Sequence, residues 1–256
     1  MSLAHGALMF AAAFVAGGIN SIAGGGTLVT FPVLLWLGLD PKVANATSTV
    51  ALWPGFFGGV FGFRREISDS REHLLWLGIT SLIGGAVGAA LLILTPSQTF
   101  ASLVPFLILF ATLLFTLQEQ VSRRLRLHER TTSPTGARRW VGPIIVQLFA
   151  SIYGGYFGAG NSILILATLG LFGLTDIHRA NGIKNFLGIC INSVAVLAFA
   201  LSSLVYWPDA LLMMVGAIAG GYYGASAARR LGRTFVRRTV VLIGLVIGVI
   251  MLWRIS

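Results

Sequence analysis

Charged residues are scarce in this sequence of 256 residues. Asp, Glu, Lys and Arg make up 10% of it, hydrophobic residues make up 56%, and the mean hydropathy is +0.86. A soluble domain carries about 25% charged residues, so this chain has too little charge to cover a water-facing surface. The composition excludes a soluble enzyme, a disordered protein and a coiled coil, and it predicts an integral membrane protein.

Cysteine and membrane-embedded acids are also nearly absent. The one cysteine, Cys190, permits no intrachain disulfide and no multi-cysteine metal site. The eight acidic residues and four histidines lie in polar stretches or at the ends of apolar ones, which does not fit a buried proton relay or an intramembrane nucleophile. The sequence therefore predicts no catalytic residue, no metal site and no cofactor. Because no basic region precedes it, we expect Leu3–Ala23 to be retained rather than cleaved as a signal peptide.

Long apolar segments are what the sequence has in abundance. They predict helices, because a backbone in lipid must satisfy its own hydrogen bonds, and they lack the alternation of a β-barrel. Two of them have only 12 residues, about 18 Å of helix against a hydrocarbon core of about 30 Å. Each short segment follows a glycine-rich break, so we expect it to form a hairpin with the segment before it. The ten segments are Leu3–Ala23, Thr27–Gly38, Val43–Phe63, Leu74–Leu94, Thr99–Gln118, Val141–Phe157, Ser162–Gly173, Asn185–Tyr206, Ala210–Ala228 and Phe235–Trp253.

The two halves of the chain resemble each other. The segment Gly18–Ala89 aligns with Gly154–Ala225 without a gap and gives 15 identities in 72 positions, among them glycines of both breaks. The predicted fold is an all-α integral membrane protein of two inverted-topology repeats, each a glycine-broken helical hairpin plus three transmembrane helices. We expect residues 1–118 to form repeat one, 119–140 a basic linker and 141–256 repeat two.

The positive charge predicts how the chain sits in a membrane. The net charge is +10, and 16 of the 18 basic residues fall in four clusters between apolar segments. Cytoplasmic loops carry such an excess of Lys and Arg, and the inner leaflet supplies anionic lipid for them. We therefore expect a membrane protein with a cytoplasmic linker and both termini on the opposite, periplasmic side. Its partners would be membrane lipid and a small anionic substrate, with no nucleic acid.

The two glycine-rich breaks predict an anion site. A helix that starts after a break directs backbone N–H groups and its positive dipole end toward the fold interior. The alternative is that these glycines only break helices or allow close packing, as Gly84, Gly85, Gly88, Gly220, Gly221 and Gly224 are expected to do. Lys184 either pairs with an anion or extends to the interface, and Asp40 and Asp176 are expected to cap helices. The candidate substrate-binding residues are Gly24, Gly25, Gly26, Thr27, Asn45, Ser48, Gly160, Asn161, Ser162, Asn181 and Lys184.

One run of residues resembles a known family. The segments Ala16–Gly26 and Gly38–Ser48, with Pro32 between them, are similar to the TauE/SafE family, sulfite and sulfonate exporters also called the toluene sulfonate uptake permease group. The second copy at Gly154–Asn185 fits too, although Thr168 replaces the proline. The resemblance implies bacterial inner-membrane transport of small sulfur oxyanions.

Three functions are compatible with these observations. The first is export of sulfite or small organosulfonate anions through a central site between inverted repeats. The second is a transporter or channel for another small anion or carboxylate. The third is a membrane enzyme or a scaffold, which the lack of buried acids and the paired helix breaks disfavour.

Overall fold

The described chain is helical from end to end. The computed structural model describes residues 3–22, 24–62, 71–127, 138–171, 174, 177–224 and 233–255, and no β-strand occurs within them. The elements are α1 (Leu3–Ile22), α2 (Thr27–Trp36), α3 (Pro41–Leu52), α4 (Pro54–Gly62), α6 (Arg71–Leu94), α7 (Ser97–Leu127), α8 (Arg138–Tyr156), α9 (Asn161–Leu171), α10 (Ile177–Leu201), α11 (Trp207–Ala219), the π-helical turn η2 (Gly220–Gly224) and α13 (Arg233–Ile255).

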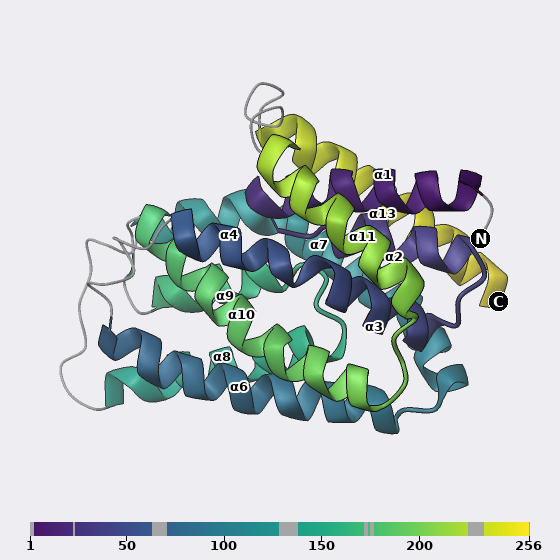
Figure 1. Ribbon diagram of the computed structural model, residues 1–256. Coiled ribbons are helices and arrows are strands. Elements are labelled where there is room, and N and C mark those ends of the chain that lie inside the picture. The colour runs from purple at the N-terminus through teal and green to yellow at the C-terminus, as the bar shows by residue number, and fades with distance from the viewer. Residues whose placement is uncertain are drawn as a thin grey trace.

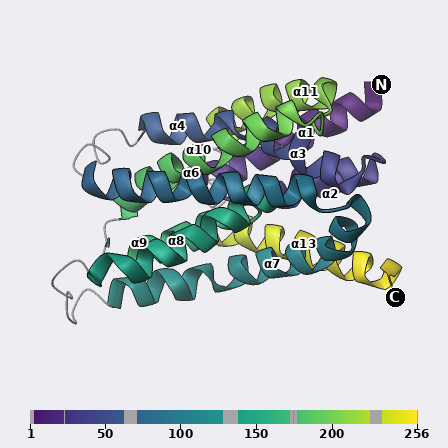
Figure 2. The same ribbon diagram turned by 90° about the horizontal axis from the view of Figure 1, so that it is seen from below.

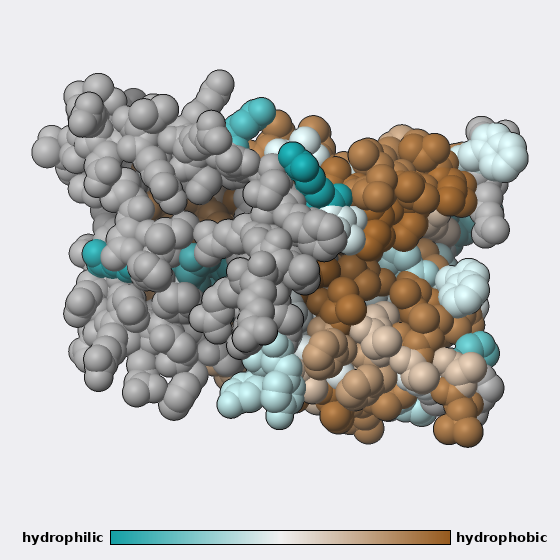
Figure 3. All heavy atoms as spheres, turned by 90° about the horizontal axis from the view of Figure 1, so that it is seen from above, coloured by the Kyte–Doolittle hydropathy of each residue, from teal (hydrophilic) through white to brown (hydrophobic). Residues whose placement is uncertain are grey.

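Several helices have the length and composition of membrane spans. Among the described residues, four segments are long and apolar enough to cross a membrane, namely Leu3–Asn20, Leu74–Leu94, Ser97–Leu117 and Arg179–Leu201. The outer surface is correspondingly apolar: on α11 alone, Leu211, Val215 and Ile218 are each more than half exposed. Figure 3 shows that the described side chains of one face are largely hydrophobic. An exposed apolar surface of this extent suits lipid contact.

The helices lie side by side along one direction (Figures 1 and 2). Both views place the N- and C-termini at the same end of the molecule. The end of α7 and the start of α8, which flank residues 128–137, lie at the opposite end. The two termini therefore share one side of the bundle, and the segment that joins the halves leaves and returns on the other.

Glycines bring several helices close together. Gly88 on α6 faces α8, where an added Cβ would lie 2.8 Å from the backbone nitrogen of Tyr156. Gly85 on α6 faces α10, where a Cβ would lie 2.7 Å from the carbonyl oxygen of Ile191. On the other side of the bundle, Gly220 meets the carbonyl of Phe14 on α1. The predicted packing role is confirmed for Gly84, Gly85, Gly88 and Gly220, because only a missing side chain permits such an approach. For Gly221 and Gly224 it stays a prediction.

Each half begins with a hairpin whose second arm is short. Helix α2 has 10 residues and α9 has 11, and they pack against α1 and α8 respectively. The breaks contain glycines in the left-handed region, with φ of +71° at Gly24, +106° at Gly25, +78° at Gly158 and +76° at Gly160. Other residues rarely adopt this backbone, so the glycines are needed to turn the chain.

Some predicted boundaries were wrong. The segment predicted at Val43–Phe63 is two helices that meet at Trp53, ahead of Pro54. Helix α10 begins at Ile177 rather than Asn185, because its first turns contain polar side chains that hydropathy excludes from an apolar segment. Helix α7 continues to Leu127 and so takes in part of the predicted linker 119–140, of which residues 128–137 lie outside the described residues.

Asp40 begins α3 as predicted. Its carboxylate accepts a hydrogen bond of 2.9 Å from the backbone N–H of Lys42, which caps the helix. The ammonium group of Lys42 donates to the carbonyls of Ile93 and Thr95 at 3.0 and 2.7 Å, at the C-terminus of α6 where a cation is favourable. Asp176, the other predicted cap, lies outside the described residues.

Candidate functional site

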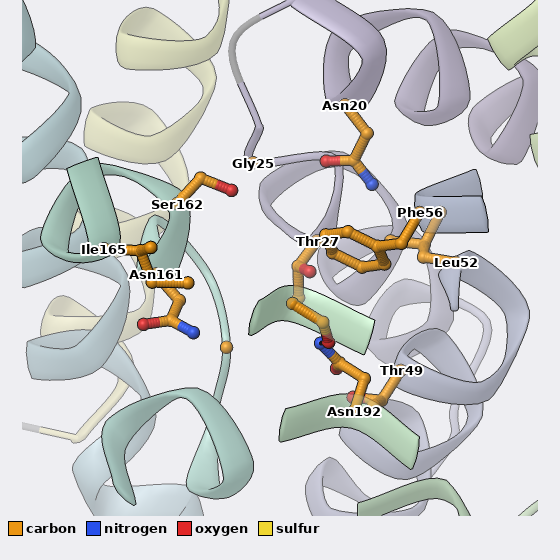
Figure 4. Close-up of a pocket in the computed structure, with 12 residues that line it drawn as sticks. Asn20, Gly25, Thr27, Thr49, Leu52, Phe56, Asn161, Ser162, Ile165 and Asn192 are labelled. Carbon is orange, nitrogen blue, oxygen red and sulfur yellow. Dashed lines mark hydrogen bonds between the residues drawn. The ribbon is translucent and has the colours of Figure 1, made fainter. Parts of the chain in front are cut away.

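A small pocket lies between the two glycine-rich breaks. The volume of the pocket is about 30 Å³, and one water needs roughly 10–15 Å³. The pocket therefore admits a ligand of a few heavy atoms. Figure 4 shows residues of α9 on one side of it and residues of α2, α3, α4 and α10 on the other. The lining residues are Asn20, Gly25, Thr27, Thr49, Leu52, Phe56, Gly158, Asn161, Ser162, Ile165, Gly188 and Asn192.

The first break is held by a side chain of the preceding helix. The amide oxygen of Asn20 accepts a 2.7 Å hydrogen bond from the backbone N–H of Gly26, and the N–H of Leu28 donates to the carbonyl of Gly25 at 3.0 Å. Gly25 also lies against the ring of Phe115 on α7, with no room for a Cβ between them. These contacts fix the start of α2 so that Thr27 faces the pocket.

The second break is held in a different way. The hydroxyl of Tyr153 donates to the carbonyl of Ala159 at 2.6 Å, and the N–H of Asn161 donates to the carbonyl of Gly158 at 3.2 Å. The side chain of Asn161 fits against Gly154, is 6% exposed and leaves its Oδ1 without a hydrogen-bond partner. A buried polar atom without a partner costs about 1–3 kcal/mol, and this oxygen is fully buried, so the pocket does not expose it to a ligand.

The two breaks touch each other. A Cβ added to Gly24 would lie 2.6 Å from the Cβ of Ser162, which places the starts of α2 and α9 at one point in the fold. The positive ends of both helix dipoles therefore act on the same small pocket. All of its described lining residues are uncharged, so an anion here would be held by dipoles and neutral donors.

The backbone amides are less available than the sequence predicted. The N–H groups of Gly26, Leu28 and Asn161 already donate within the fold. The predicted row of free amides is wrong for these three, because each glycine-rich turn closes on its own carbonyls or on Asn20. Side-chain donors such as Thr27 and Ser162 must therefore contribute much of any anion binding.

Four of the predicted binding residues line the pocket: Gly25, Thr27, Asn161 and Ser162. Three others, Gly24, Gly26 and Gly160, are not among the described lining residues and instead form the turns around it. In particular, Gly26 packs against α1, where a Cβ would lie 2.6 Å from the carbonyl oxygen of Ala16.

The remaining four predicted residues lie outside the described lining. Asn45 donates to the carbonyl of Tyr156 at 3.0 Å and so joins α3 to α8, while Ser48 shares a 2.6 Å hydrogen bond with Thr30. Both side chains make hydrogen bonds within helix contacts and lie outside the described lining, so their role as donors to the ligand stays a prediction. Asn181 and Lys184 each interact with another group, and Lys184 is 3% exposed, which argues against a side chain extended to the interface.

Several lining residues were missed by the sequence argument. Asn20, Thr49 and Asn192 stand among the polar residues near the breaks, but only helix rotation decides which of them face inward. One sequence signal was available, because the alignment of the two halves pairs Leu52 with Gly188 and Phe56 with Asn192. Once a residue of the pocket is known, its counterpart in the other half becomes a candidate.

Comparison with known proteins agrees with these features. The family described as "Sulfite exporter TauE/SafE" matches residues 9–251. A "Probable membrane transporter protein" of Haemophilus influenzae is 29% identical, covering 92% of this chain and 90% of its own length. "Probable membrane transporter protein YfcA" of Escherichia coli K12 is 27% identical, covering 96% and 89%. No solved structure matches. The chain is a multi-pass membrane transporter and belongs to the sulfite exporter TauE/SafE family.

Proposed function

We propose that this protein exports sulfite or small organosulfonate anions across the bacterial inner membrane through the pocket between the two breaks. The observation that carries the proposal is the meeting of two helix N-termini at one uncharged, donor-bearing pocket. Sulfite and sulfonate groups present oxygens that accept hydrogen bonds, and helix N-termini favour anions. A site without a permanent positive charge can also release its ligand, which transport requires.

Two inverted repeats would carry this function. The alignment of the halves pairs the first residues of α3, α6 and α7 with the first residues of α10, α11 and α13, as Pro41 with Ile177. Packing follows the same relation: α1 packs against α11, and α6 packs against α8. Both termini lie at one end of the bundle, as an inverted pair with a linker on the far side would require. Inverted-repeat transporters bind substrate near the midplane, where broken helices meet.

The basic clusters support one orientation. With 16 of the 18 basic residues on the cytoplasmic side, the linker would be cytoplasmic and both termini periplasmic. Export then corresponds to movement from the end at which α7 and α8 are joined toward the end that bears the termini.

A binding and flux assay tests the proposal. Purified protein in lipid nanodiscs would be titrated with sulfite, thiosulfate, isethionate, sulfoacetate and taurine, with acetate and chloride as comparison anions. Efflux from proteoliposomes loaded with each bound anion would follow. We expect saturable binding and efflux of sulfite or a sulfonate. The proposal fails if none of these sulfur anions binds, or if acetate binds and moves better than all of them.

A further inference from the structure

The pocket contains hydrogen-bond acceptors as well as donors, and their balance bears on which ionisation state of the ligand fits. Resting on the proposed function, we infer that the pocket selects a singly charged oxyanion that carries its own acidic hydrogen. For sulfite this is the protonated monoanion rather than the dianion. The inference deepens the proposed function by naming the ionised form that is bound.

The donors come from the two breaks. Asn20 uses its amide oxygen on Gly26, which leaves its Nδ2 group as a donor. The hydroxyls of Thr27 and Ser162 stand at the starts of α2 and α9. Together these three side chains can meet the unprotonated oxygens of an anion.

The acceptors come from α3 and α10. The hydroxyl of Thr49 donates to the carbonyl of Asn45 at 2.9 Å, so toward the pocket its oxygen can only accept. The Nδ2 group of Asn192 donates one of its two hydrogens to the carbonyl of Gly188 at 2.8 Å, and its amide oxygen remains as an acceptor. Figure 4 places Thr49 and Asn192 next to each other, across the pocket from Asn161.

Asn161 adds no acceptor that a ligand in the pocket could reach. Its Oδ1 atom is fully buried without a hydrogen-bond partner, and Figure 4 shows it on the side of the amide away from Thr49 and Asn192. A fully ionised sulfite offers only lone pairs, so it would face the oxygens of Thr49 and Asn192 without a hydrogen for either. A monoanion with one acidic hydrogen can donate to one of these two acceptors while its other oxygens accept from the breaks.

Charge acts in the same direction. The cost of moving an ion into a low-dielectric interior rises with the square of its charge, and an unpaired buried charge is expensive. The described lining has no cation to offset a second negative charge. A protonated ligand would also bring its proton with it, so that proton coupling needs no carboxylate in the pocket.

A protein side chain that titrates near the pocket could also make binding depend on pH. The described titratable side chains on the lining helices lie outside the lining of the pocket; they are His5 on α1, Lys42 on α3, and Arg179, Lys184 and Cys190 on α10. If the ionisation of the ligand sets how affinity depends on pH, the affinity for a ligand that titrates will change with pH. The affinity for a ligand that does not titrate will stay constant.

The test is a titration series in nanodiscs, with sulfite and methanesulfonate each measured across the second ionisation of sulfurous acid. Methanesulfonate keeps a single charge at every pH used. We expect the apparent affinity for sulfite to fall by about tenfold per pH unit above that ionisation, while that for methanesulfonate stays constant. An affinity for sulfite that is independent of pH, or that rises with pH, overturns the inference but leaves the proposed function intact. Failure of both ligands to bind at any pH overturns both.

Variants add a second readout. The double variant Thr49→Val/Asn192→Leu removes two acceptors, and we expect it to bind sulfite and methanesulfonate with more similar affinity than the parent does. Ser193→Ala is the matched control, since its hydroxyl makes the same kind of bond to its own helix, to the carbonyl of Ile189 at 2.7 Å, outside the lining. The inference is wrong if the double variant, folded by its thermal transition, keeps the parent's preference.

Discussion

The two halves of the chain align in sequence without a gap but bring different side chains to the pocket. Gly25 of the first break aligns with Asn161 of the second. The same alignment pairs Leu52 with Gly188 and Phe56 with Asn192, and all six residues line the pocket. In each aligned pair, a small or apolar residue in one half corresponds to a larger or polar residue in the other half.

This difference separates two roles. The glycine turns and helix starts recur in both halves, so they belong to the fold. At these aligned positions the carboxamides of Asn161 and Asn192 occur in the second half only, so we expect them to serve ligand recognition. Different side chains at aligned positions thus make the lining of the pocket asymmetric.

The largest effect we predict is an all-or-none difference in labelling, which tests whether the halves are inverted. In a Cys190→Ser background, Thr132→Cys should react with a membrane-impermeant thiol reagent only from the cytoplasmic side. Ser2→Cys should react only from the periplasmic side. The expectation follows from the distribution of basic residues. Labelling of both positions from the same side of intact cells would contradict the inverted arrangement.

The next effect is loss of the first turn. Gly25→Val should abolish sulfite binding, because a branched side chain is strained at a φ of +106° and would collide with Phe115. Gly142→Val is a suitable control, since a Cβ there meets nothing within 4 Å. Gly85 is unsuitable as a control because it packs on the backbone of α10.

Binding would be measured by calorimetry, on protein that elutes as one species and keeps a thermal transition. If a Gly25→Val protein that passes these checks binds sulfite like the parent, the first break serves packing only.

Converting the second break to the sequence of the first should have a smaller effect. Asn161→Gly removes a carboxamide from the pocket but keeps the turn, since glycine adopts any backbone that asparagine does. A hydrogen bond to a charged group contributes roughly 1.5–3 kcal/mol, so sulfite binding should weaken about ten- to a hundredfold. Thr80→Val, on the exposed side of α6, should leave binding unchanged. Unaltered affinity in Asn161→Gly would show that the asymmetry of the breaks is not used by the ligand.

The sequence was sufficient for features that depend on local chemistry. The hairpin arms predicted at Thr27–Gly38 and Ser162–Gly173 correspond to α2 and α9. Each break contains glycines at positive φ, a backbone conformation that ends a helix and that other residues rarely adopt. The cap at Asp40 follows from the same local logic.

Features that depend on packing could not be predicted. Asn45 and Ser48 are polar and close to the break, yet Asn45 binds the carbonyl of Tyr156 and Ser48 binds Thr30. Lys184 is buried in α10 although its charge suggests a helix end. Which face of a helix meets the pocket depends on how the helix is rotated against several neighbours. Hydrophobic periodicity does not identify that face where nearly every face is apolar.

A buried polar cluster provides a weaker test of the comparison. Between α6 and α8, Gln147 donates to Ser81 at 2.9 Å and to Ser151 at 3.2 Å, and its Oε1 has no partner. In the register that aligns the halves, the corresponding residues are the apolar Ala11, Val15 and Ala217 on α1 and α11, which also pack against each other. Ala11 and Val15 are exposed and Ala217 is buried, so this pair of helices packs without a polar cluster at these positions.

The triple variant Ser81→Ala/Gln147→Ala/Ser151→Val copies that apolar set. Replacing both partners of a buried hydrogen bond by apolar groups of the same shape is often nearly neutral, but Gln147→Ala also leaves a cavity. We therefore expect a loss of stability of about 1–3 kcal/mol and unchanged sulfite efflux. Thermal unfolding and proteoliposome flux would be measured together. Normal unfolding with lost efflux would mean that this cluster takes part in transport and that the two contacts are not equivalent.

The smallest effect concerns the cap of α3. Asn is as good a helix cap as Asp, so Asp40→Asn should change stability by only a few tenths of a kcal/mol, whereas Asp40→Ala should cost about 1 kcal/mol. Neither substitution should uncouple sulfite efflux from a proton gradient, because Asp40 is exposed at the start of α3 and its carboxylate is used on the N–H of Lys42. Thermal unfolding separates the two variants, and efflux driven by an imposed pH difference tests the coupling.

A folded Asp40→Asn protein that moves sulfite but ignores the pH difference would place the coupling proton on this carboxylate. The proton would then be carried by Asp40 rather than by the ligand. A residue of the first half to which we assign only a structural role would take part in transport.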